Sequence, residues 1–189
     1  NEELARKIRI FRNHGITSDH HQREKSNSWF YEMKTLGYNY RITDFQCALG
    51  LNQLKKLPNW ITRRKEIANI YDDLFKDIDH ISPLSINNNS SHAYHLYVVR
   101  IASAHLNINR DTLFKKLREK GIGVNVHYIP VHLHPFYKEN YDTFIGQCPE
   151  SELVYGEILS LPIFPMMNDK DPVFVFKSIK NIINESTTS

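Results

Sequence analysis

A run of glycine, tyrosine, asparagine and arginine directly before a predicted helix has the chemistry to hold an anion. The run is residues 36–41, LGYNYR, and the helix after it opens with Thr43 and Gln46 at capping-box spacing. Helix N-termini attract anions because their first amide hydrogens are unpaired, and the guanidinium of Arg41 suits a phosphate or carboxylate. The run therefore indicates a phosphate site, and a structural turn capped by Asn39 is the alternative.

Three histidines at 127, 132 and 134 could suggest a metal site. Prolines at 130 and 135 argue against a regular strand through the cluster, and it contains no Cys, Asp or Glu to complete a zinc set. We therefore predict no metal site.

His127 differs from the other two histidines because it falls in a segment with the alternation of a half-buried strand. Ile122, Val124 and Val126 alternate there with polar residues, which places His127 on the face away from the apolar layer. Histidine titrates near neutrality, so a cleft-lining His127 could handle protons. A histidine that merely faces solvent is the equal alternative.

Other chemical signatures are absent from the sequence. The segment FRNHG at residues 11–15 is explained by a helix end, with Gly15 as the left-handed stop. We find no catalytic triad, no P-loop and no dinucleotide fingerprint, since Gly37 and Gly50 are too far apart for the last.

The elements that must position these residues follow from periodicity. Residues 16–36 read as a long loop, and residues 79–92 form a Ser/Asn-rich break, which we take as the boundary of a second unit. Pro58 is expected to end the first of two long helices, which is apolar almost all round and so should pack against a larger body or another subunit. The sequence predicts helices over 1–12, 43–57, 59–75, 110–120, 149–159 and 171–183, strands over 94–101 and 122–128, and an extended segment over 160–165.

Composition bounds the class of protein. The 189 residues are 41% hydrophobic and carry a net charge of +3, too small and scattered to predict nucleic-acid binding. No apolar run is long enough to span a bilayer, so no membrane segment is expected. Cys47 and Cys148 make no disulfide framework, and we expect a reducing, cytoplasmic setting. The sequence starts inside a helical pattern, so we expect an excised piece of a longer protein.

Four motifs in order resemble one family. They are FRNHG at 11–15, LGYNYRITDFQCALGLNQL at 36–54, GIGVNVHYIPVH at 121–132 and SLPIFP at 160–165. Together they resemble the DegT/DnrJ/EryC1 sugar aminotransferases, which depend on pyridoxal 5′-phosphate (PLP). The branch that makes UDP-4-amino-4,6-dideoxy sugars is especially similar. The likeness covers nearly the whole chain.

The resemblance implies an α/β fold of the aspartate-aminotransferase type. Residues 1–78 would be the C-terminal helices of the large PLP-binding domain, and residues 79–189 a small α+β domain. The lysine that forms a Schiff base with PLP would lie before residue 1, so this chain would carry no catalytic residue and would be inactive alone. Family members are homodimers with active sites at the interface.

Site residues follow from the same resemblance. Asn39 would reach the PLP phosphate of the partner subunit, and His127 would line the active site near the substrate. The remaining substrate-binding candidates are Trp29, Tyr38, Tyr40, Arg41 and Tyr128.

The implied reaction is transamination in two half-reactions. L-glutamate would give its amino group to the cofactor, which would pass it to the keto group of a UDP- or dTDP-linked 4-keto-6-deoxy sugar in glycan or surface-polysaccharide biosynthesis. Two alternatives are a protein of the PLP fold without transaminase activity and a nucleotide-sugar binding module.

Overall fold

The protein is described here by a computed structural model that covers residues 1–76, 78–87, 89–102 and 106–187. It divides into two compact units, residues 1–55 and residues 56–189, which are described separately. Asn88, in the predicted Ser/Asn-rich break, lies outside the described residues. The domain boundary at 78/79 concerns the whole protein and stays a prediction.

The first unit begins with the predicted N-terminal helix and contains one helix that periodicity missed. Helix α1 spans Glu2–Phe11, and the side chain of Asn1 caps it by accepting from the Leu4 amide at 3.1 Å. Helix α2, His20–Lys25, lies within the predicted loop 16–36. Asp19 and Gln22 form a complete capping box there, which accounts for a six-residue helix without an apolar stripe.

Helix α3 spans Asp44–Phe75 without interruption, so the prediction that Pro58 ends a helix is wrong. A proline in a helix interior removes one backbone hydrogen bond and crowds the preceding turn, at a cost of about 3 kcal/mol. Tertiary packing offsets that cost, since Ile67, Ala68 and Tyr71 are buried further along the same helix. The capping box predicted for the start is confirmed, because Thr43 and Gln46 exchange hydrogen bonds of 3.0 and 3.3 Å.

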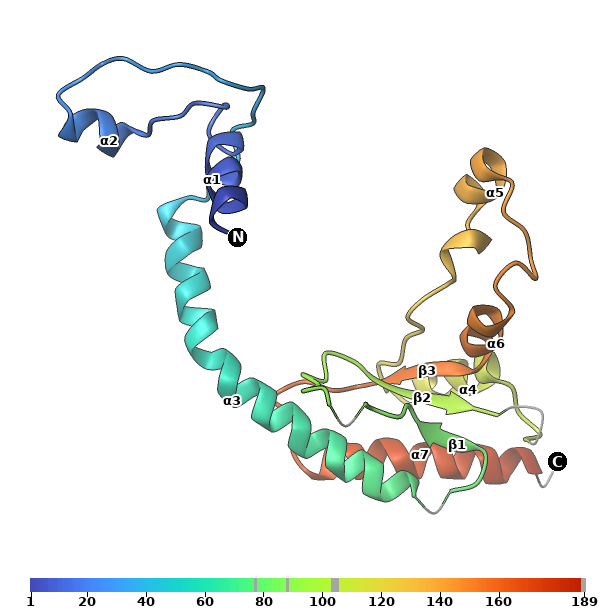
Figure 1. The fold of residues 1–189 in the computed structure, drawn as a ribbon. Helices are drawn as coiled ribbons and strands as arrows, with labels where there is room; N and C mark the ends of the chain where they lie inside the picture. Colours follow the sequence, from blue (N-terminus) through green and yellow to red (C-terminus); the bar gives the residue numbers. More distant parts are fainter. Residues whose placement is uncertain (77, 88, 103–105, 188–189) are drawn as a thin grey trace. The chain divides into compact units, whose positions relative to one another are not determined.

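The second unit is built on a small antiparallel sheet in the order β1-β2-β3 (Figure 1). The strands are β1 Ile81–Pro83, β2 Tyr97–Ile101 and β3 Ile158–Leu161. Along β2, Tyr97, Val99 and Ile101 are buried and alternate with half-buried residues, so one face of the strand packs into the core. Strand β1 falls in the predicted break, and β2 begins three residues after the predicted start at Tyr94.

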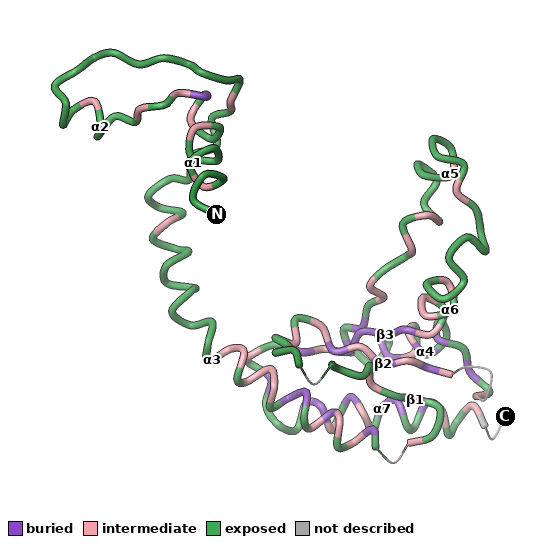
Figure 2. The backbone as a smooth tube through the Cα atoms, viewed as in Figure 1, coloured by how far each residue is buried: buried purple, intermediate pink, exposed green. Residues whose placement is uncertain are grey.

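The sheet and the helices of this unit share one hydrophobic core. Buried positions gather around the sheet and its helices, whereas the segment from α1 to the start of α3 is almost entirely exposed (Figure 2). Leu113, Leu117, Ile179 and Ile182 are fully buried. The helices of this unit after α3 are α4 Arg110–Glu119, the short helix η2 Val131–Leu133, α5 Pro135–Tyr141, α6 Pro149–Glu157 and α7 Lys170–Thr187.

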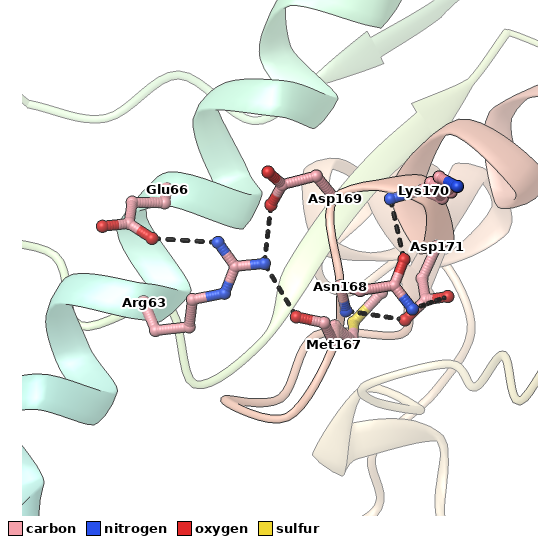
Figure 3. Close-up of polar contacts among 7 residues, drawn as sticks. All are labelled: Arg63, Glu66, Met167, Asn168, Asp169, Lys170 and Asp171. Carbon is pink, nitrogen blue, oxygen red and sulfur yellow. Dashed lines mark hydrogen bonds and ion pairs between the residues drawn. The ribbon is translucent and has the colours of Figure 1, made fainter.

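Hydrogen bonds and an ion pair connect the second half of α3 to the segment that precedes α7. Arg63 donates to the Met167 carbonyl and to the Asp169 carboxylate, both at 2.7 Å, and to Glu66 at 2.9 Å (Figure 3). These bonds to two acids raise the pKa of Arg63, so its charge is secure. Nearer the sheet, Arg64 donates to the Ile163 carbonyl at 2.9 Å and Tyr71 to the Pro162 carbonyl at 3.0 Å. These contacts fix the chain directly after β3.

Residues 122–128 do not form the predicted strand. Ile122 and Val124 are buried between exposed neighbours, so the predicted alternation is present. Among the described residues, the strand-type pairing of this segment is limited to one bridge, in which Asn125 and Ser160 exchange backbone hydrogen bonds of 3.1 and 2.8 Å. Strand β3 offers an edge of only four residues, and Pro130 has no amide to continue a ladder.

Candidate functional site

Two of the sequence motifs meet in the first unit. The amide of Tyr38 donates to the Phe11 carbonyl at 2.7 Å, and the amide of Tyr40 to the Arg12 carbonyl at 2.9 Å. The amide of His14 also donates to the Tyr38 carbonyl at 2.9 Å, and Asn13 and Asn39 form an antiparallel bridge. The FRNHG and LGYNYR segments are therefore one backbone-paired assembly, although about 25 residues separate them.

Two glycines make this pairing possible. A Cβ atom on Gly37 would lie 2.2 Å from the Gly15 amide nitrogen, and one on Gly15 would lie 1.7 Å from the Thr35 carbonyl oxygen. Gly15 also has a φ of 72°, in the left-handed region that favours glycine. The helix end predicted at Gly15 is thus also the place where the second motif crosses the first.

Asn39 is exposed, and no hydrogen bond of its side chain occurs among the described residues. It does not cap helix α3, because Thr43 and Gln46 do so. Backbone hydrogen bonds of Tyr38 and Tyr40 fix the main chain on either side of Asn39. Its side-chain amide is therefore exposed to solvent on a backbone of fixed conformation. This geometry favours the phosphate interpretation over the capping turn.

The two tyrosines that flank Asn39 in the sequence stack on each other. Tyr38 and Tyr40 stack with centroids 4.8 Å apart, and Phe11 meets Tyr38 edge-on at 5.1 Å. Arg41 donates to the Asn13 side chain at 2.8 Å, which leaves its other donors free to bind a ligand. Trp29 is 85% exposed and contacts the ring of Phe30, so the structure gives it no contact with this stack.

The second candidate group lies in the second unit and centres on His127. Its Nδ1 lies 2.9 Å from the hydroxyl oxygen of Ser160, and its Nε2 lies 3.3 Å from the amide nitrogen of Asn125. The Asn125 oxygen accepts from the Val126 amide at 2.8 Å, so the Asn125 nitrogen is the end that faces the ring. Neutral His127 is therefore protonated at Nδ1, donates to Ser160, and accepts at Nε2.

The surroundings of His127 argue against the solvent-facing alternative. The residue is half-buried and engaged at both ring nitrogens, so it is not a freely solvated histidine. Tyr128 follows through a cis peptide bond and is 71% exposed, with its ring 4.6 Å from that of His127. Sequence reasoning missed Ser160 as a partner, although Ser160 opens the SLPIFP motif.

The other histidines of the predicted cluster do not join His127. The Nε2 of His132 lies 2.8 Å from a carboxylate oxygen of Glu152, which also accepts from the Gly146 amide at 2.7 Å. The bond from His132, with help from the backbone amides, lowers the pKa of Glu152. Among the described residues the one group with metal-ligand geometry is His20, His21 and Glu24, which is fully exposed.

Tyr97, the first residue of β2, is buried and makes a short hydrogen bond. The Tyr97 hydroxyl donates to Asp72 at 2.6 Å, and burial followed by this bond raises the pKa of Tyr97. The pair borders a cavity of about 470 Å³ whose lining contains none of the predicted site residues. None of the described helices combines the length and apolarity needed to cross a membrane.

Known proteins of similar sequence were found over nearly the full chain. It is 42% identical to an uncharacterized protein of Methanocaldococcus jannaschii, over 98% of this chain and 48% of that protein. It is 37% identical to the UDP-4-amino-4,6-dideoxy-N-acetyl-beta-L-altrosamine transaminase of Campylobacter jejuni, over 98% of this chain and 46% of that enzyme.

Solved structures agree. Helicobacter pylori PseC, an aminotransferase of pseudoaminic acid biosynthesis, matches with a TM-score of 0.84 and 28% identity over 98% of this chain and 47% of that one. The protein Spr1654 of Streptococcus pneumoniae in its PLP-form matches with a TM-score of 0.82 and 27% identity, over 98% of this chain and 44% of that one.

These matches establish the coverage, the fold and the family of this chain. It spans about half the length of the curated relatives it matches. Its fold is that of one part of the PLP-dependent aminotransferases. The sequence profile of the DegT/DnrJ/EryC1/StrS aminotransferases matches residues 1–180, and the chain therefore belongs to this family.

Proposed function

We propose that the whole protein is a PLP-dependent aminotransferase that moves an amino group from L-glutamate to a nucleotide-linked 4-keto-6-deoxy sugar in the cytoplasm. The observation that carries the proposal is the likeness to PseC, which extends over 98% of this chain with a TM-score of 0.84. The Campylobacter jejuni relative, a transaminase named for a UDP-linked amino sugar, supports the same substrate class.

Asn39 fits a role in holding the cofactor phosphate. Its side-chain amide is exposed and engaged by no described residue, on a backbone fixed by the hydrogen bonds of Tyr38 and Tyr40. An amide N–H can donate to a phosphate oxygen without moving this backbone. When bound, PLP would supply the carbonyl that accepts the amino group from the donor and then passes it on to the acceptor. In a homodimer, Asn39 would serve the cofactor of the partner subunit.

His127 fits a role beside the reacting carbonyl. Since Nδ1 donates to Ser160, the lone pair of neutral His127 is at Nε2, where the Asn125 amide lies at a long 3.3 Å. A substrate hydroxyl could replace this weak donor and be oriented by the ring. His127 would therefore position the sugar, or hold a proton at Nε2, with its ring direction already set by Ser160.

Further proposed substrate contacts are aromatic and cationic residues in each unit. The stacked pair Tyr38–Tyr40 offers faces suited to a base or sugar, and Arg41 keeps donors for the diphosphate. Trp29 and Tyr128, both largely exposed, are available to the nucleotide or the sugar. The Schiff-base lysine is expected outside this chain, in the part of the fold that the relatives have beyond it.

Isotope transfer tests the proposal. The whole protein is incubated with ¹⁵N-labelled L-glutamate and a UDP-linked 4-keto-6-deoxy sugar, and the products are analysed by mass spectrometry. We expect ¹⁵N-labelled amino sugar and 2-oxoglutarate in equal amounts. A protein that binds the UDP-sugar but forms neither product is instead the nucleotide-sugar binding module, and the aminotransferase proposal is then wrong.

A further inference from the structure

Arginines gather around one cavity that lies entirely within the first unit. The cavity has a volume of about 610 Å³, and α1, α2 and the two paired motifs contribute to its wall. Its size falls in the range of about 300–1,000 Å³ that is typical of small-molecule sites. Five of its lining residues are arginines, namely Arg6, Arg9, Arg12, Arg23 and Arg41.

The positive charge of this wall is not balanced from within. Asp19 is the only carboxylate that lines the cavity, and its side chain accepts from the Gln22 amide at 2.8 Å as the cap of α2. A cavity lined by five arginines, with one carboxylate that already caps a helix, has a positive potential that favours anions.

The arginines also lack acidic partners on the surface. Within the described residues, no carboxylate forms an ion pair with any of the five, whereas Lys7 on the same helix pairs with Glu3 at 2.9 Å. Arg6 and Arg9 stand three residues apart on one face of α1, where like charges repel. A bound anion would relieve this repulsion.

Two of the arginines are already held in place. Arg23 donates to the Ser18 carbonyl at 2.8 Å, and its guanidinium carbon lies 5.1 Å from the centroid of the Tyr31 ring. Arg41 is held by its 2.8 Å bond to Asn13. Each bond uses one of five donors, so both guanidinium groups can still bind phosphate oxygens in pairs at little further entropic cost.

We propose that this cavity binds an anion that carries a diphosphate group. Phosphate oxygens suit the paired donors of arginine better than a single carboxylate does, and one phosphate could not engage all five guanidinium groups. The diphosphate could come from a nucleotide or from free pyrophosphate. The nucleotide source rests on the function proposed above, whereas pyrophosphate binding does not.

Calorimetric titration of the whole protein separates these cases. The probes are inorganic pyrophosphate, UDP and the uncharged nucleoside uridine, each at about 50 and about 300 mM NaCl. We expect pyrophosphate and UDP to bind, uridine not to bind, and the affinities to fall as salt screens the arginines. UDP that binds at least about tenfold more tightly than pyrophosphate identifies a nucleotide as the source, and equal affinity identifies the free anion.

Charge variants locate the binding. Arg9→Gln with Arg12→Gln should lower the affinity for pyrophosphate at least about tenfold, because two charge-assisted hydrogen bonds are lost. Lys7→Gln, on the same helix but outside this cavity, should change it less than about twofold. If the double variant Arg9→Gln with Arg12→Gln does not fold, as judged by circular dichroism, the double variant Arg6→Gln with Arg9→Gln replaces it. Undetectable pyrophosphate binding, or unchanged affinity in a folded arginine variant, would overturn the proposal.

The two proposals fail separately. If the wild-type protein transfers ¹⁵N but does not bind pyrophosphate, the proposal for the arginine cavity is wrong and the aminotransferase proposal stands. Arginine-dependent pyrophosphate binding in a protein without transfer would refute the aminotransferase alone.

Discussion

Asn39 and His127, the two main proposed site residues, differ in what the structure fixes. The structure fixes the backbone of Asn39 and leaves its side chain exposed, whereas it fixes the His127 ring itself through Ser160 and Asn125. The first arrangement suits an amide that completes its hydrogen bond when a phosphate arrives. The second suits a ring whose tautomer matters before the ligand binds.

The first prediction concerns the cofactor. In the whole protein, Asn39→Ala should weaken PLP retention about tenfold, because one hydrogen bond to a charged phosphate is lost. The measurement is the PLP absorbance left after dialysis. Asn52→Ala, an exposed asparagine on α3, is the matched control and should retain PLP like the wild type. Equal retention by the two variants would remove Asn39 from the phosphate site.

The second prediction concerns the tautomer of His127. Long-range ¹H–¹⁵N spectra of the imidazole should show the proton at Nδ1 in the wild type at neutral or higher pH. Ser160→Ala removes the acceptor of that proton, so the Nε2–H tautomer, preferred by free histidine, should gain population while the fold is kept. A wild-type spectrum with the proton at Nε2 would contradict the hydrogen-bond assignment.

Sequence reasoning reached some of these residues and missed others for a physical reason. Asn39, Arg41 and His127 stand in local patterns of residue type and spacing, which one sequence displays. Ser160 lies 33 residues after His127, and the arginine cavity joins α1, α2 and Arg41. Contacts of that separation depend on tertiary packing, which spacing does not encode.

Among the elements, the helices with an apolar stripe were predictable, whereas α2, which has a capping box but no such stripe, was missed. Helices α1 and α4 lie within one residue of the predicted spans, because Asn1 and Asn109 cap them. The prediction that a helix ends at Pro58 was wrong because it used local propensity alone. Helix α3 continues through Pro58, and the packing of Ile67 and Tyr71 stabilises it there. The strand predicted over 122–128 failed because alternation reports burial on one face and not the presence of a pairing partner.

The third prediction tests the crossing of the two motifs. Gly37→Ala should destabilise the first unit by about 1–3 kcal/mol, because its Cβ would meet the backbone of Gly15 at 2.2 Å. Gly50→Ala is the matched control, since nothing lies within 4 Å of its Cβ. An alanine in that helix should stabilise by about 0.5–1 kcal/mol. Urea unfolding followed by circular dichroism measures both, and equal stability would show that the motifs do not cross so closely.

The fourth prediction concerns the link from helix α6 to His132. The folded pKa of Glu152 is lowered, so its contribution to the free energy of unfolding is present above the ordinary glutamate value of 4.5 and lost as the pH falls below it. Glu152→Gln should therefore be less stable than the wild type near pH 6, and the difference should shrink toward pH 3.

Thermal unfolding across this range measures the effect, with Glu150→Gln as the control because Glu150 is exposed in the same turn of α6. A Glu152→Gln penalty that stays constant with pH would contradict the predicted ionised hydrogen bond.

At the scale of the whole molecule, the fold class and the family were predictable because four motifs occur in the right order along the chain. The family profile over residues 1–180 confirms the membership, and PseC confirms the fold. The chain spans about half of its relatives, and the apolar residues at the start of α3, with Phe45 80% and Leu54 62% exposed, face no partner among the described residues of the first unit. Which surface covers them is a property of the whole protein.

The central claim is that the whole protein uses PLP to accept an amino group from glutamate. The most direct test is the absorbance spectrum of the purified whole protein, recorded before and after addition of L-glutamate without any sugar. We predict a visible band from the lysine-linked cofactor, which disappears as glutamate is converted to an equal amount of 2-oxoglutarate. A protein with no such band even after incubation with PLP, or with a band that glutamate leaves unchanged, would contradict the account.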